Sequence, residues 1–231
     1  MRGASQARML VRPVLRSWYR LVVLGADQVP AAGPVIVASN HVGILDGPLL
    51  LASTPRPVRI MAGQDAFAAP LDGIMAKAGL IGLRPGVAPY SAVADASATL
   101  AEDGGVALFP EGRRGTGRVL SISHVVALLA LRTGATVVPA AIAGTRRDGM
   151  DADALPRRRS RVAVMFGAPF TVTSDRDHSS RTVIAGAGEA IRQRMADLAA
   201  EVELATAIRL PDQVPEHPRG SRERDYEEAR R

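Results

Sequence analysis

Four short and nearly continuous apolar segments limit the folds open to this chain. They lie at residues 35–38, 106–109, 136–142 and 161–166. Segments of this length with apolar side chains at successive positions are typical of strands buried on both faces. Weaker strands are expected at 58–62 and 79–83, and helices at 48–53, 64–78, 90–103, 124–133 and 180–206. The alternation predicts a single α/β domain whose central sheet, mostly parallel or mixed, is flanked by helices.

The N-terminal segment predicts an amphipathic helix over residues 8–24. Arginines recur at every fourth position, and apolar side chains take the opposite side: Arg8, Arg12, Arg16 and Arg20 against Leu10, Val11, Val14, Leu15, Trp18, Leu21 and Val22. Such a helix packs on the core as an ordinary surface helix, or it lies in a membrane interface with its apolar side in the lipid. Both interpretations stay open from the sequence.

Charge and composition indicate where this protein is located in the cell and which chemical groups it binds. Lys and Arg total 29 against 23 Asp and Glu, which gives a net charge of +6. Nearly all the basic residues are Arg, which favours forked contacts with phosphate or carboxylate groups. No apolar run reaches the roughly 18 residues of a membrane-spanning helix, and none resembles a signal peptide. We therefore expect a peripheral protein on the cytoplasmic face of the membrane.

The chain shows no internal repeat and no second domain boundary. We expect a membrane-docking helix at 1–24, one domain at 25–208, and a charged tail at 209–231 that is disordered because it is rich in charge and proline. The chain has no cysteine, which excludes disulfides and thiolate catalysis. Nothing in the sequence indicates an oligomeric state.

A histidine and an aspartate follow the first buried strand. His41 comes after Ser39-Asn40, and Asp46 is five residues further on. Five residues of ideal helix turn ~500°, which leaves the two side chains ~140° apart, so a pair requires a turn between them. Gly43 permits that turn, and Pro48 fits the first turn of a helix that begins near Asp46. The spacing predicts a general base held by a carboxylate.

The other histidines, His124, His178 and His217, lack such a setting and are expected to be structural.

Two further strand ends carry charged residues. After the strand at 106–109 comes Pro110-Glu111-Gly112-Arg113-Arg114, and Arg84 follows the weaker strand at 79–83. The first loop is either a solvated turn or an anion site, in which backbone amides near Gly112 and a guanidinium bind phosphate oxygens. It is not a nucleotide P-loop, and the chain has no Gly-x-Ser-x-Gly elbow.

Four segments together resemble the glycerolipid acyltransferases of the 1-acylglycerol-3-phosphate acyltransferase type. Residues 40–46 resemble their N-H-x4-D motif, and residues 109–114 resemble F-P-E-G-T-R. Residues 79–85 lie where the family has G-x-I-x-x-x-R, and residues 137–142 resemble its V-P-[V/A]-x-I strand. The segments occur in the family's order. Arg113 stands at the Thr position, and Arg84 lies one residue before the family's Arg.

The resemblance implies acyl transfer from acyl-CoA or acyl carrier protein to a lysophospholipid hydroxyl, most simply lysophosphatidic acid giving phosphatidic acid. His41 would remove the hydroxyl proton and Asp46 would hold the imidazole. Oxyanion donors are expected among the backbone amides near Gly43 or Gly112. No cofactor or metal is implied. The acceptor would be bound by Glu111, Gly112, Arg113, Arg114 and Arg84, in a pocket shaped by Asn40, Gly43, Pro110 and Pro139.

Three alternatives remain beside this interpretation. The same transfer to another lysophospholipid or alcohol differs only in the acceptor. A non-catalytic lipid-binding or CoA-binding protein would keep the fold without the reaction. A nucleic-acid binder is disfavoured, since the chain has no recognisable binding module and only 3% aromatic residues for base stacking.

Overall fold

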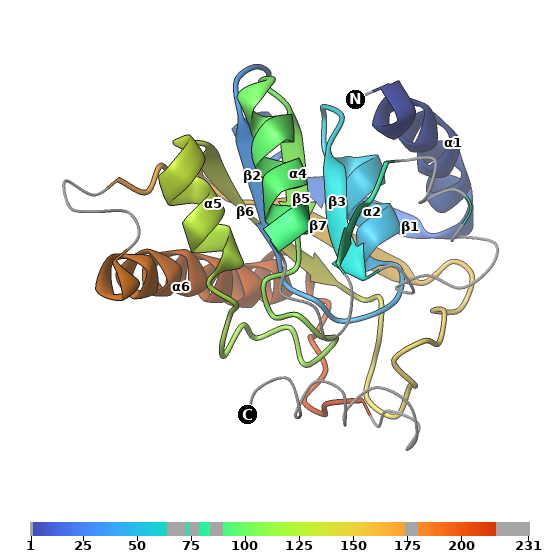
Figure 1. Ribbon diagram of the computed structural model, residues 1–231. Coiled ribbons are helices and arrows are strands. Elements are labelled where there is room, and N and C mark those ends of the chain that lie inside the picture. The colour runs from blue at the N-terminus through green and yellow to red at the C-terminus, as the bar shows by residue number, and fades with distance from the viewer. Residues whose placement is uncertain (1, 64–72, 74–78, 84–89, 174–179, 216–231) are drawn as a thin grey trace.

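The computed structural model describes residues 2–63, 73, 79–83, 90–173 and 180–215, and its centre is a seven-stranded sheet (Figure 1). The strands are β1 (Arg20–Leu24), β2 (Val35–Ser39), β3 (Arg59–Gly63), β4 (Ile81–Leu83), β5 (Gly105–Leu108), β6 (Thr136–Ala143) and β7 (Arg161–Phe166). Their order across the sheet is β1-β7-β6-β2-β5-β3-β4. All neighbours are parallel except the pair β6 and β7, so the predicted mixed α/β sheet is confirmed.

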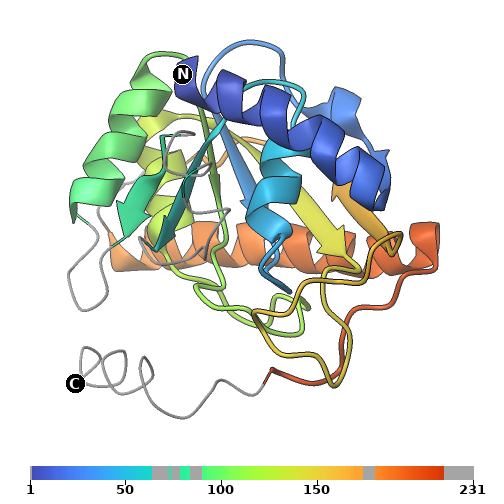
Figure 2. The ribbon, with the colours of Figure 1, turned by 90° about the vertical axis from the view of Figure 1, so that its right-hand side faces the viewer.

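Helices cover both faces of the sheet. The elements are α1 (Arg2–Trp18), the 3-10 turn η1 (Ala26–Gln28), α2 (Asp46–Ser53), α4 (Tyr90–Ala101), α5 (Val125–Thr133) and α6 (Arg181–Thr206). One apolar core lies between the sheet and α4, α5 and α6, and the other lies under α1 and α2. Figure 2 shows α1 and α2 on the near side, with α6 beyond the sheet.

The central strands follow the rule for sheets covered on both sides. All five residues of β2 are buried, as are all four of β5 and seven of the eight in β6. Fully burying a Val or Ile side chain is worth roughly 1.5–3 kcal/mol, and both faces of each strand contribute. The continuous apolar segments therefore become the interior of the sheet, and their polar ends are left to the loops.

The predicted N-terminal helix is wrong beyond Trp18. Residues 20–24 leave the helix and pair in parallel with β7 as an edge strand. The backbone changes direction because the amide of Arg159 donates to the Trp18 carbonyl and the amide of Arg20 donates to Ser160. Residues 20–24 thus belong to the sheet and not to a docking helix.

Helix α1 packs on the core, as one of the two interpretations expected, and its place in a membrane interface stays a prediction. Ala7, Val11 and Leu15 are buried in the core that α2 shares. Four large apolar side chains stay open to solvent: Met9 (75% exposed), Leu10 (62%), Val14 (50%) and Trp18 (49%). The helix packs on the domain and also keeps an apolar ridge. Within the described part of the chain, no helix has the length and apolar character needed to cross a membrane.

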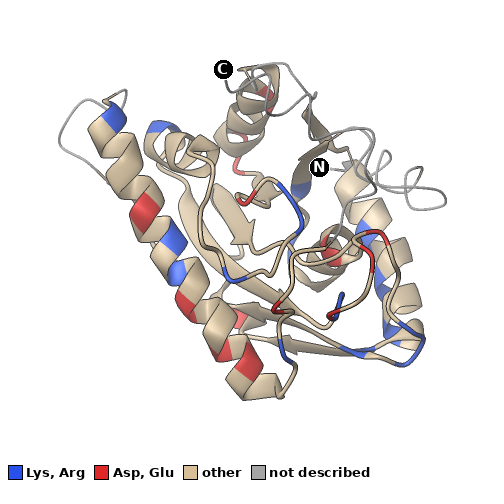
Figure 3. Ribbon diagram, turned by 90° about the horizontal axis from the view of Figure 1, so that it is seen from below, with Lys and Arg blue, Asp and Glu red and all other residues tan. Residues whose placement is uncertain are grey.

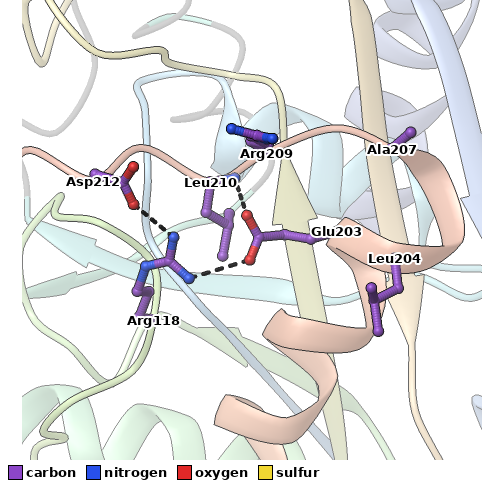
Figure 4. A pocket seen from close by; sticks show the side chains of 7 residues that line it. All are labelled: Arg118, Glu203, Leu204, Ala207, Arg209, Leu210 and Asp212. Carbon is purple, nitrogen blue, oxygen red and sulfur yellow. Dashed lines mark hydrogen bonds and ion pairs between the residues drawn. The ribbon is translucent and has the colours of Figure 1, made fainter.

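Part of the predicted disordered tail is ordered. Residues 209–215 fold back along the end of α6, and Leu210 is buried in the core. Figure 4 shows Arg118 bridging Glu203 of α6 and Asp212, beside an open hollow of about 570 Å³. The charged composition of this segment predicted a disordered tail, and it did not reveal the ion pairs of Arg118 with Glu203 and Asp212. Residues 216–231 lie outside the described residues, as does nearly all of the predicted helix at 64–78.

Candidate active site

The parallel strands β2, β5 and β6 deliver their loops to one edge of the sheet, which Figure 3 views from outside. His41 follows β2, and Glu111 follows β5. The backbone register places Ala38 between Leu108 and Pro139, so the two loops emerge side by side. The topology therefore brings together two motifs that are far apart in the sequence.

The predicted pair of His41 and Asp46 is present. Nδ1 of His41 lies 2.8 Å from Oδ2 of Asp46, at the first residue of α2. The same oxygen accepts the amides of Val42 (2.5 Å) and Gly43 (2.9 Å), which closes the turn between the two residues. Asp46 is fully buried, whereas the imidazole is 18% exposed. A carboxylate therefore fixes one ring nitrogen of an imidazole that stays partly open to solvent.

Asn40 anchors the base of this turn. Its amide nitrogen donates to the carbonyls of Gly117 and Ile142, both at 3.1 Å, and its oxygen accepts the amide of Ile142 at 2.7 Å. Gly117 has a φ of +72°, and a β-carbon there would lie 2.7 Å from the Asn40 amide nitrogen. Only glycine fits this conformation and this approach. Asn40 is thus buried and joins β2, β6 and the loop after β5.

Glu111 contacts the backbone of the histidine. Its Oε1 accepts the His41 amide at 2.8 Å, and a direct contact of Glu111 with the acceptor stays a prediction. Burial raises the pKa of Glu111 to about 7; the hydrogen bond from the His41 amide opposes that shift and repulsion from Asp46 adds to it. The carboxyl therefore titrates near neutral pH directly beside the candidate base.

Phe109 is a site residue that the sequence did not single out. Its ring stacks on the His41 imidazole, with 4.3 Å between centroids and 20° between the planes. This stacking restricts rotation of the His41 side chain. Its position immediately before Pro110-Glu111, at the end of a buried strand, was the available signal, but it also suits an ordinary core residue.

The two arginines of the second loop differ in their surroundings. Nη2 of Arg114 pairs with Oδ1 of Asp153 at 2.6 Å, and the Arg114 side chain is only 16% exposed. Arg113 is exposed, and no ion pair to it occurs within the described ranges. One guanidinium is therefore engaged by the protein, and the other is available at the surface.

Two of the amides predicted as oxyanion donors are already engaged. Gly43 donates to Asp46, and the Gly112 amide donates to the Phe109 carbonyl at 3.0 Å. Each closes a turn within its own loop. These two amides are therefore not free in this conformation, and an oxyanion donor among the other backbone amides near Gly43 or Gly112 stays a prediction.

The remaining predicted residues fall into two groups. The carbonyl of Pro110 accepts the Ser123 amide at 2.7 Å, and the carbonyl of Pro139 accepts Gly167 at 2.9 Å inside the sheet. These contacts are structural, and a place for Pro139 in a pocket stays a prediction. His124 caps the start of α5 beside Gly188 of α6, as expected for a structural histidine. Arg84, His178 and His217 lie outside the described residues.

Together these contacts produce an imidazole that is ready to accept a proton. One nitrogen is hydrogen-bonded to a buried carboxylate, one ring face is stacked on Phe109, and the backbone amide is held by Glu111. Such an arrangement suits a general base acting on a hydroxyl.

Comparison with known proteins gives one family match and several relatives. The family model described as Acyltransferase matches residues 20–143, more than half of the chain. Uncharacterised proteins of Mycobacterium tuberculosis and Mycobacterium bovis are 32% identical over 157 residues, which is 59% of this chain and 42% of each relative. An uncharacterised Mycobacterium leprae protein is 30% identical over the same length, 41% of its own. The chain thus spans about two fifths of these relatives.

A solved structure resembles the whole fold. It is the 1-acyl-sn-glycerophosphate (LPA) acyltransferase PlsC from Thermotoga maritima, with a TM-score of 0.61 and 20% identity, covering 85% of this chain and 80% of that one. At this identity the match establishes the fold alone. The family model begins at Arg20, the first residue of β1, and includes both the His41 turn and the Glu111 loop. The chain belongs to the acyltransferase family.

Proposed function

We propose that this protein transfers a fatty acyl group from an acyl thioester, acyl-CoA or acyl carrier protein, to the free hydroxyl of a lysophospholipid. The preferred acceptor is 1-acylglycerol-3-phosphate, which would give phosphatidic acid in phospholipid synthesis. The observation that carries the proposal is the 2.8 Å contact between His41 Nδ1 and the buried Asp46 carboxylate. The Thermotoga maritima protein with the same fold is a 1-acyl-sn-glycerophosphate acyltransferase, which supports the choice of acceptor.

The reaction begins at the ring nitrogen of His41 that Asp46 does not hold. Nε2 accepts the proton of the acceptor hydroxyl while the oxygen attacks the thioester carbonyl. The tetrahedral intermediate expels the thiolate, which takes the proton back from the imidazolium. Asp46 holds the imidazole in the required tautomer and stabilises its positive charge. Positioned base catalysis of this kind is worth ~10²–10⁴ in rate.

The acceptor phosphate is assigned to the loop of Glu111, Gly112, Arg113 and Arg114, with Arg84 as a further contact. Arg113 is the exposed guanidinium of this loop, so it is the first contact for a phosphate oxygen. Arg114 must exchange its ion pair with Asp153 before it binds a ligand. That pairing favours one alternative, the same transfer to an acceptor without phosphate.

Helix α1 is assigned to the membrane surface. Its exposed Leu10, Val14 and Trp18 and its line of arginines, visible as a blue band in Figure 3, suit an interface that contains anionic lipid. We propose peripheral binding to the cytoplasmic face of the membrane, where the lysophospholipid acceptor resides.

Purified protein tests the reaction directly. Radiolabelled acyl-CoA is incubated with lysophosphatidic acid, with other lysophospholipids and with monoacylglycerol, and the lipid products are separated by chromatography. We expect labelled phosphatidic acid, and a loss of ~10²–10⁴ in kcat for His41→Ala. Thr171→Ala, an exposed change after the last strand, is the matched control. Full activity of His41→Ala would falsify the base assignment, and labelled product only from monoacylglycerol would move the proposal to the neutral acceptor.

A further inference from the structure

Arg146 is the largest fully buried side chain among the described residues, at 1% exposed. It follows β6 after Gly144-Thr145, and its neighbour Arg147 is exposed. A guanidinium loses much of its hydration when it is buried, so it is retained in such a place only where several acceptors compensate. Its surroundings therefore indicate what it holds.

Three backbone carbonyls accept hydrogen bonds from Arg146. Nε donates to Val42 at 3.0 Å, and Nη2 donates to Gly115 and to Gln213, both at 2.8 Å. The acceptors belong to three different segments: the turn between His41 and Asp46, the loop after β5, and the segment that follows α6. One side chain thus ties both motif loops to the C-terminal segment.

The contact lies next to the candidate base. Val42 is the residue after His41, and its amide donates to Asp46 while its carbonyl accepts from Arg146. Gly115, a second acceptor, donates its own amide to the His41 carbonyl at 2.9 Å. The two peptide groups that follow His41 are therefore fixed by the same guanidinium, the Val42–Gly43 group directly and the His41–Val42 group through Gly115.

The positive charge of Arg146 also lies close enough to interact with the Asp46 carboxylate. Burial lowers the pKa of Arg146, and attraction to Asp148 and Asp46 acts in the opposite direction. Asp46 is fully buried, and its Oδ1 has no hydrogen-bond partner in the described structure. A nearby positive charge offsets part of the cost of that buried carboxylate.

We propose that Arg146 is a positioning residue, which holds the Val42 carbonyl so that His41 and Asp46 keep their productive geometry, and which makes the segment 209–215 part of the active-site support. It acts through the backbone and does not touch substrate. The proposal rests on the proposed role of His41 as the base.

The C-terminal segment 209–215 is itself held in place by two contacts. The Gln213 amide donates to Oδ1 of Asp148 at 2.9 Å, and Asp212 pairs with Arg118 at 2.8 Å. The chain therefore presents the Gln213 carbonyl to Arg146 from a segment held on both sides. Loosening either anchor weakens the support without altering any residue of the His41 turn.

Two substitutions separate the shape of Arg146 from its charge. Arg146→Lys keeps the charge but loses the forked donor geometry, and Arg146→Met keeps a similar length without either. Displacement of reacting groups by about 1 Å costs on the order of 10²-fold in rate. We expect kcat to fall about tenfold in Arg146→Lys and about 10²-fold in Arg146→Met, with the Michaelis constants of both substrates changed less than threefold. Arg147→Met, the exposed neighbour, leaves kcat unchanged.

Proton NMR of the His41 imidazole gives a readout that does not depend on turnover. An Nδ1 proton shared with a carboxylate resonates far downfield, and its signal is identified because His41→Gln removes it. We expect this signal to broaden or shift in Arg146→Lys and in Asp148→Ala, the latter with the smaller change in kcat, and to stay in place in Arg147→Met. Thermal unfolding by circular dichroism checks that each variant is folded.

The outcomes separate the two proposals. If wild-type protein transfers no acyl group but the His41 signal responds to Arg146→Lys, the proposed function fails and the positioning role stands. If wild-type protein is active and Arg146→Lys leaves both kcat and the signal unchanged, Arg146 does not position His41. A variant that raises only the Michaelis constants would also overturn the proposal. Should Arg146→Met fail to fold, the Lys and Asp148→Ala variants decide the question in the same way.

Discussion

The two motif loops at the edge of the sheet are built differently. In the turn from His41 to Asp46 the carboxylate is fully buried, and it receives the imidazole and two backbone amides. In the loop that contains Arg113, the Arg113 side chain is exposed, and Arg114, which is 16% exposed, has a single ion pair with the exposed Asp153. The candidate base is therefore organised without a substrate, whereas the loop proposed to bind the acceptor phosphate holds its exposed guanidinium by no ion pair within the described residues.

The largest effect is expected where the ordered turn is broken. Asp46→Asn retains an oxygen for the amides of Val42 and Gly43 but loses the charge that faces the imidazole. We expect kcat to fall on the order of 10²-fold with little change in fold, because His41 loses its preferred tautomer. Steady-state kinetics with a thermal unfolding control measures both. Unchanged kcat would mean that the turn needs only the hydrogen bonds and not the carboxylate.

Glu111 belongs to the second loop and accepts the backbone amide of His41 in the first. Its titration therefore tests the contact between the two loops. Its pKa is raised from 4.5 to about 7, so the folded protein binds this proton more tightly than the unfolded chain does. The protonated form contributes stability that is complete below about 4.5 and is lost as the pH rises towards 7. Glu111→Gln should abolish that decrease in the free energy of unfolding, which amounts to at most about 3 kcal/mol.

Urea unfolding of the wild type and the variant at pH 5 and pH 8 measures this difference. Gln keeps an oxygen for the His41 amide, so the variant at pH 8 should be at least as stable as the wild type. An equal decrease in both proteins between the two pH values would place the titrating group elsewhere.

Smaller effects are expected in the loop proposed to bind the acceptor phosphate. Arg113→Ala should raise the Michaelis constant of a phosphate-bearing acceptor about tenfold, since one charge-assisted contact is worth roughly 1.5 kcal/mol or more. Arg114→Ala should have a weaker effect, because its guanidinium is already paired with Asp153. Monoacylglycerol is the control acceptor, and its Michaelis constant should not change. A larger effect at Arg114 would show that the ion pair opens when substrate binds.

A comparable effect concerns a third region, the exposed apolar ridge of α1. Leu10→Ser should weaken binding to vesicles that contain anionic lipid by about tenfold, the loss expected for removing one large apolar contact. Leu10 is 62% exposed, whereas its neighbour Val11 is buried, so a change at Leu10 leaves the core side of the helix intact. Co-sedimentation with vesicles measures the binding. Equal binding of both proteins would assign α1 to packing alone.

The sheet interior could be predicted because its signal is local and repeated. The apolar segment at 35–38 is part of β2, and the helix expected at 124–133 is α5, which ends at Gly134 in a left-handed conformation. The boundary at Trp18 was missed because Leu21, Val22 and Val23 suit either a helix face or an edge strand. Only pairing with β7 decides between them.

Charge misled the prediction at the other end of the chain. The segment 209–215 reads as a solvated tail, but Asp212 meets Arg118 and Gln213 meets Arg146. A charged composition indicates that burying the segment would cost free energy, but it does not identify the partner residues that offset this cost. Those partners come from residues 94 and 67 positions away.

The sequence by itself determined the layered α/β fold and the turn that joins His41 to Asp46, because both depend on neighbours within a few residues. Tertiary structure decided the other contacts of the imidazole and of the backbone around it. Glu111 reaches the His41 amide across 70 positions, Arg146 reaches Val42 across 104, and Phe109 stacks on the ring. Parallel strands bring such distant segments to one edge of the sheet, and burial there raises the pKa of Glu111. No local pattern encodes either effect.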